Sequence, residues 1–185
     1  MTALEVTHSL TADEIDALVD TMRPHALDII NHTRDHRARL VKPLVSYDAQ
    51  ALALSFLPAA GEPGRVNNDA FTYHHLRRDL HKKAEAAGVK VASRYVIPSA
   101  HLTIARFVTK RDFETASGEV DHAKVEKLVT TIDEINHWLE ANYWPRDIGV
   151  LAGGEWIVGE EKGLDFRKGA LWFGGGETVQ LGEGF

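Results

Sequence analysis

The stretch Ser-Ala-His-Leu-Thr-Ile-Ala-Arg-Phe, residues 99–107, decides how the rest of the chain is interpreted. Apolar and β-branched residues surround one histidine and one threonine, which predicts a buried strand. Because side chains alternate between the faces of a strand, His101 and Thr103 share one face, and Leu102 and Ile104 point into the opposite layer. An imidazole beside a hydroxyl places a proton-transfer group next to a hydrogen-bond donor. The alternative is a half-buried histidine whose nitrogens are satisfied within the fold.

A second stretch, Met-Thr-Ala-Leu-Glu-Val-Thr-His-Ser at residues 1–9, predicts a strand that runs into a helix. His8 would lie on the same face as Thr2, but at about 3.3 Å per residue it would be about 20 Å away. Leu10 stands where a His-x-Thr pattern needs its threonine. We therefore interpret His8 as a residue of the turn between the strand and the helix.

The run His-Leu-Thr-Ile-Ala-Arg-Phe resembles the second motif of the two-histidine (2H) phosphoesterase superfamily. That family includes RNA 2′,3′-cyclic phosphodiesterases and the 2′-5′ RNA ligases, and in several members an arginine closes the motif where Arg106 stands. Residues 1–9 resemble the first motif of fungal members, with Thr2 as its threonine and its histidine expected immediately before Met1. The family usually has a strand and a helix before this motif, so the resemblance implies a truncated version.

The resemblance implies an α+β fold in which two pseudo-symmetric lobes of antiparallel sheet and helices surround a central cleft. It implies a metal-independent phosphoesterase without a cofactor, acting on RNA 2′,3′-cyclic phosphate or a related cyclic nucleotide. His101, Thr103 and Thr2 would be catalytic, and Arg106 would bind the phosphate. Strict alternation places Arg106 on the face opposite His101, so it can serve only if the strand bends, bulges or ends there. The alternative is a non-catalytic nucleotide- or RNA-binding module that lacks one acid/base group.

Length and composition limit the class of protein and its partners. The chain has 185 residues, no cysteine and a net charge of −6. We expect one domain, with lobe one at about residues 1–60 and lobe two at about 69–185, because a Gly-, Pro- and Asn-rich break separates them. The acidic balance argues against duplex DNA but allows a small nucleotide or an RNA end carrying a cyclic phosphate. We expect no membrane partner and an intracellular protein, cytoplasmic or nuclear.

Hydrophobic periodicity and capping residues predict the remaining elements. We expect helices after a Thr11–Glu14 capping box, from Ala70 to about Ala87, and from Asp121 to Pro145, with a break at Pro24. The second helix carries a basic outer face that includes Arg77 and Arg78, and Tyr73 and His75 near its start are candidates to touch a nucleotide. His32 and His36 have metal-ligand spacing but flank a helix end, so a metal enzyme is a third alternative. The strands are expected at residues 39–47, 51–58, 89–97, 101–108, 148–151, 155–160, 164–166 and 170–173.

Overall fold

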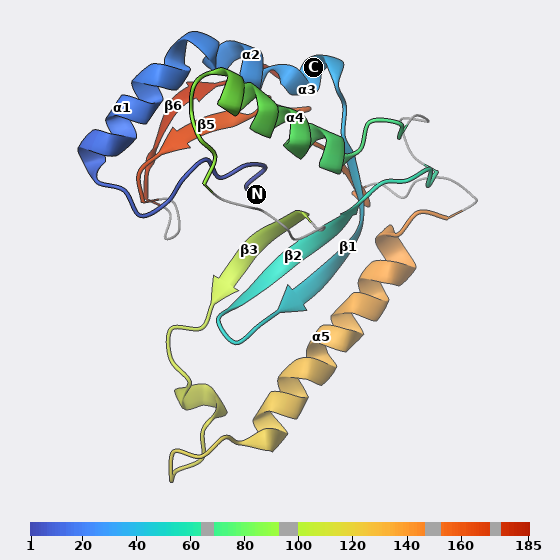
Figure 1. Ribbon diagram of the computed structural model, residues 1–185. Helices are drawn as coiled ribbons and strands as arrows, with labels where there is room; N and C mark the ends of the chain where they lie inside the picture. The colour runs from blue at the N-terminus through green and yellow to red at the C-terminus, as the bar shows by residue number, and fades with distance from the viewer. Residues whose placement is uncertain (64–68, 93–99, 147–152, 171–174) are drawn as a thin grey trace.

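The computed structural model describes residues 1–63, 69–92, 100–146, 153–170 and 175–185, and it has an α+β fold. A curled antiparallel sheet has the strand order β3-β2-β1-β4, and a separate hairpin pairs β5 with β6. Figure 1 shows α1, α2 and α4 grouped with the hairpin, while β1, β2 and β3 extend away from them beside the long helix α5. The strands are β1 (Arg39–Tyr47), β2 (Ala51–Pro58), β3 (Ala100–Arg106), β4 (Glu155–Ile157), β5 (Asp165–Lys168) and β6 (Glu177–Leu181).

The helices begin at side-chain caps that satisfy their first backbone N–H groups. The predicted capping box of Thr11 and Glu14 starts the first helix, and Asp121 caps the long helix α5 as predicted. The helix of the central region starts later than predicted, because Thr72 caps it and His75 completes the capping box. The helices are α1 (Ala12–Met22), α2 (Ala26–Ile30), α3 (His32–Asp35), α4 (Tyr73–Ala86) and α5 (His122–Tyr143), with 3-10 turns η1 (Arg23–His25) and η2 (Arg111–Phe113).

The sheet corrects the prediction that β3 is buried. In the described residues β3 pairs only with β2 and forms an edge of the sheet. Leu102 is 39% exposed and Ile104 is 55% exposed, so neither lies in a covered layer. The helix α5 instead runs along β1, where the side chain of Asn136 accepts from the N–H of Val45 and donates to its carbonyl. The strands at 39–47 and 51–58 have the predicted bounds.

Residues 1–9 do not form the predicted strand and have no regular secondary structure. The N–H of Ala92 donates to the carbonyl of Val6 at 2.8 Å, which pairs this segment with the chain that follows α4. Met1, Leu4 and Val6 pack against the central cluster of buried side chains. The predicted strand at 89–97 is not formed at 89–92, and residues 93–99 lie outside the described part of the chain.

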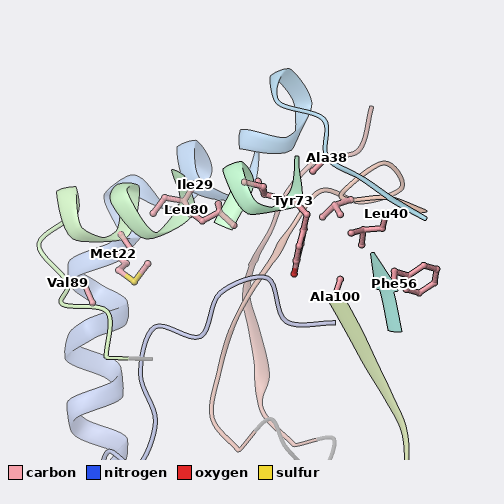
Figure 2. Close-up of a cluster of buried hydrophobic side chains, with 12 residues drawn as sticks. Met22, Ile29, Ala38, Leu40, Phe56, Tyr73, Leu80, Val89 and Ala100 are labelled. Carbon is pink, nitrogen blue, oxygen red and sulfur yellow. The ribbon is translucent and has the colours of Figure 1, made fainter. Parts of the chain in front are cut away.

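The hydrophobic core lies where the helices meet the upper ends of the sheet strands. Figure 2 shows Ile29 and Leu80 on the helix side and Leu40 and Phe56 on the sheet side, with Tyr73 between them. Burying a leucine of this kind contributes roughly 1.5–3 kcal/mol to folding. The start of β3 and the N-terminal segment therefore pack on the same core.

The chain after α5 follows the predicted pattern only in part. Strands form at β4 and β5 close to the predictions for 155–160 and 164–166. The last strand, β6, was not predicted, because Glu177–Leu181 has charged and polar residues on an exposed hairpin. The strand expected at 148–151 and most of the one expected at 170–173 lie outside the described residues.

Candidate functional site

A β-bulge in β3 brings three of the predicted site residues to one face of the sheet. The cross-strand partners of β2 and β3 are Ser55 with His101, Ala53 with Thr103 and Ala51 with Arg106, and the register shifts once between Leu52 and Ala53. Directly opposed residues of an antiparallel pair share a face, and the three β2 partners are spaced two residues apart. The histidine, the threonine and the arginine of β3 therefore lie on the same face.

The bulge resolves the difficulty that strict alternation raised for Arg106. Ile104 is the extra residue, because Thr103 and Ala105 oppose neighbouring residues of β2. An extra residue exchanges the two faces for everything that follows it in the strand. Arg106 thus returns to the face of His101, which is the condition under which it can act on the same ligand.

His101 lies where the exposed part of β3 enters the covered part. Its cross-strand partner Ser55 is 5% exposed, and the Ser55 hydroxyl lies 2.6 Å from the hydroxyl of Ser46 on β1. Burial lowers the pKa of His101, and the positive charges of the Met1 α-amino group and of Arg77 lower it further. The imidazole is therefore biased toward its neutral form, which can accept a proton.

The N-terminal segment brings Thr2 into the same region of the molecule. The Tyr73 hydroxyl donates to the Thr2 carbonyl at 3.3 Å, and Met1 packs against the cluster that includes Ala100 at the start of β3. Both figures show the N-terminal segment ending beside the start of β3. Thr2 itself is exposed, whereas His101 is half-buried. Two stretches at distant sequence positions thus meet at the end of one strand.

The two candidates on α4 have structural contacts of their own. Tyr73 is 1% exposed and belongs to the core, and its hydroxyl reaches the backbone of the N-terminal segment. His75 is half-buried, and its Nδ1 accepts from the N–H of Thr72 at 3.1 Å in the capping box. These contacts place Tyr73 next to Thr2 and His75 at the start of the helix.

The histidine pair considered for a metal is a stacked ring pair. His32 and His36 have ring centroids 4.1 Å apart at an interplanar angle of 16°, and Phe71 packs against both. Asp79 lies 3.6 Å from the Nε2 atom of His32. Within the described ranges, no group of three or more His, Cys, Asp or Glu side chains is placed to hold a metal ion.

Sequence reasoning missed one residue of this region. Arg77 is only 9% exposed, although it was predicted on the basic outer face of its helix. Its guanidinium carbon lies 5.8 Å from the centroid of the Tyr73 ring, one helical turn away. The four-residue spacing places Arg77 on the same helix face as Tyr73, but the local sequence does not show that this face is covered.

The arrangement combines a proton acceptor, a hydroxyl donor and guanidinium groups, which suits binding and chemistry on a phosphate.

Among the described residues, no helix is long and apolar enough to cross a membrane. Comparisons with protein-family models, with curated proteins and with solved structures found no match.

Proposed function

We propose that the protein is a metal-independent phosphoesterase that hydrolyses an RNA 2′,3′-cyclic phosphate or a related cyclic nucleotide. The observation that carries the proposal is the shared face of His101, Thr103 and Arg106, which depends on the bulge at Ile104. The position of Thr2 near the start of β3 supports the pairing of the two motif-like stretches. Both features are those that the resemblance to the two-histidine phosphoesterases implies.

In this proposal water attacks the phosphorus of the cyclic phosphate, and the bond to one ribose oxygen breaks. The lowered pKa of His101 suits it to accept the proton of the attacking water. The leaving ribose oxygen takes a proton from the second imidazole, which the resemblance places immediately before Met1. The Thr103 and Thr2 hydroxyls and the Arg106 guanidinium bind the non-bridging oxygens as negative charge develops there.

The experiment measures hydrolysis of a 2′,3′-cyclic nucleotide with and without a chelator. Two extended chains are compared, one with a histidine and one with a glutamine immediately before Met1. Because a positioned acid/base group contributes about 10²–10⁴-fold to a rate, the histidine chain should be faster by about 10²-fold or more. The gain should disappear in His101→Ala, because the two imidazoles act as a unit.

Two results would contradict the proposal. One is equal hydrolysis by the two extended chains together with activity that the chelator removes, which would point to the metal alternative. The other is nucleotide binding without turnover in both chains, which would identify a non-catalytic nucleotide- or RNA-binding module. Loss of that binding in the double variant His101→Ala with Thr103→Ala would still place the ligand at β3.

A further inference from the structure

We infer that the outer face of α5 binds a second copy of this chain, with the two helices antiparallel about a two-fold axis. The inference is independent of the proposed function, because α5 carries none of the candidate site residues. It rests on the exposure of α5 and on the order of charged, small and aromatic side chains along the helix.

The first support is how little of α5 the sheet covers. The helix has 22 residues, and Ile132 is the only buried one. At 1.5 Å per residue the helix is about 33 Å long, and Figure 1 shows it at the outer side of β1. Trp138 is 54% exposed and Ile135 is 40% exposed. An exposed tryptophan on a long, mostly uncovered helix suits a protein–protein contact, because tryptophan is among the residues that contribute most to such contacts.

The second support is the position of two opposite charges on the outer face. Lys127 and Glu134 are seven residues apart, which is about two helical turns, so they lie on the same face of α5. Their midpoint falls between Thr130 and Thr131. If a two-fold axis passes through this midpoint, Lys127 of each copy lies opposite Glu134 of the other. One sequence thus supplies both members of two ion pairs between the helices.

The third support is the shape of the surface between these charges. It forms a shallow hollow lined by Ala123, Glu126, Lys127, Thr130, Thr131 and Glu134. The short side chains of Thr130 and Thr131 at the axis allow two helices to approach closely. Ala123 and Trp138 have the same midpoint as the two charges. The Trp138 ring of each copy therefore falls beside the short Ala123 side chain of the other copy, which buries an aromatic surface at both ends of the contact.

The distribution of charge favours a second copy over a uniformly acidic or basic partner. In the described part of the chain the ion pairs do not include Lys127 or Glu134, whereas Lys124 pairs with Asp121 of its own chain at 3.6 Å. Both charges of the outer face are therefore free to pair with another molecule. A parallel pair of helices would place Lys127 against Lys127, so the charges select the antiparallel arrangement.

The experiment measures the mass of the full chain in solution by sedimentation equilibrium over a range of protein concentrations. The wild type should form a dimer, and added salt should weaken the dimer because exposed charges are screened. Lys127→Glu and Glu134→Lys each place like charges at both pairs and should weaken dimerisation roughly tenfold or more. The double variant exchanges the two charges and should restore the dimer. Glu140→Lys is the matched control, since it makes the same charge change on another face of α5 and should leave the dimer unchanged.

Trp138→Ala covers the case in which a charge variant does not fold, because it changes no charge and alters an exposed position. It should also weaken dimerisation roughly tenfold or more, since a tryptophan at a contact contributes strongly to binding. Circular dichroism checks that each variant keeps its helices. A wild-type chain that stays monomeric at millimolar concentration would overturn the inference. A dimer that Lys127→Glu and Trp138→Ala leave unchanged, or that the charge exchange does not restore, would overturn it as well.

Discussion

At the scale of single residues, neighbours decide what a charged or titratable side chain can do. His101 and Arg77 show this, because their residue types alone would suit a solvated surface. Burial and neighbouring positive charge bias His101 toward its neutral form, and Arg77 is buried although its residue type is common on surfaces. Neither property can be derived from the local sequence, because the groups responsible come from other elements.

Arg39 is a second buried arginine, and its partners give it a structural role. It donates to the Asp69 carboxylate at 2.6 and 3.0 Å and to Glu155 at 3.1 Å, and all three side chains are less than a tenth exposed. It also donates to the backbone carbonyls of Glu62 and Pro63. One side chain on β1 thus anchors β4 and the Gly- and Pro-rich chain before α4.

We predict that Arg39→Met strongly destabilises the fold. The substitution keeps the approximate length of the side chain but removes the guanidinium that donates to two buried carboxylates, which should reduce the free energy of unfolding by about 3–5 kcal/mol. Urea unfolding followed by circular dichroism measures the change. Arg23→Met removes the exposed pair with Asp20 and should cost about 1 kcal/mol or less. Equal losses in the two variants would show that the buried network adds little.

At the scale of elements, helix signals in the sequence were more reliable than strand signals. The Thr11 and Asp121 caps were predicted because a cap depends on residues within one turn. The exposure of β3 could not be predicted, because it depends on which elements cover the sheet. The register shift at Ile104 was also unpredictable, since a bulge is defined by the pairing of two strands.

The bulge makes a specific prediction about Arg106. Deleting Ile104 should remove the bulge and leave Arg106 two residues after Thr103, still on the face of His101. Phosphate affinity, measured from the His101 NMR signal, should then stay close to the wild-type value, whereas Arg106→Gln should lower it roughly tenfold because a charge-assisted contact is lost. Ile104→Ala is the matched control, since it keeps the register and removes only an exposed side chain.

Combining the two changes tests whether Arg106 still contacts phosphate when the bulge is removed. The Ile104 deletion together with Arg106→Gln should bind phosphate as weakly as Arg106→Gln alone. If Arg106→Gln leaves phosphate affinity unchanged with and without Ile104, Arg106 does not contribute to the site and the bulge has only a structural role.

At the scale of the whole molecule, the two motif-like stretches meet because one core joins the helices, the sheet and the N-terminal segment. Met1 packs against the buried cluster that includes Ala100, although the two residues are far apart in the chain. The sequence could indicate the α+β class through alternating helices and strand pairs. It could not indicate that residues 1–9 lack regular strand pairing, because their apolar alternation is used for packing against the core.

The stability of the whole fold should also depend on pH through His32, whose ring stacks on that of His36. Burial lowers the pKa of His32, and the positive charges of His36 and Lys83 lower it further, while Asp79 acts in the opposite direction. The Asp79 carboxylate lies 3.6 Å from His32 and raises its pKa, but burial and like charge lower that pKa by more. The Nε2 atom of His32 has no hydrogen-bond partner among the described residues, so a proton on that atom is poorly stabilised.

Because the folded state holds His32 at a lower pKa than the unfolded chain, the unfolded chain binds the proton first as the pH falls. The free energy of unfolding should thus be independent of this group above its ordinary pKa of 6.5 and should decrease as the pH falls from there toward the lowered value. Urea unfolding at pH 7.5, 6.5 and 5.5 measures this decrease. His32→Phe keeps a ring against His36 and Phe71 but cannot be protonated, so it should flatten the pH dependence, although His101 contributes with the same sign. The exposed His25, changed to Phe, is the control and should leave the wild-type slope in place. An unchanged slope in His32→Phe would show that His32 does not carry the acid sensitivity of the fold.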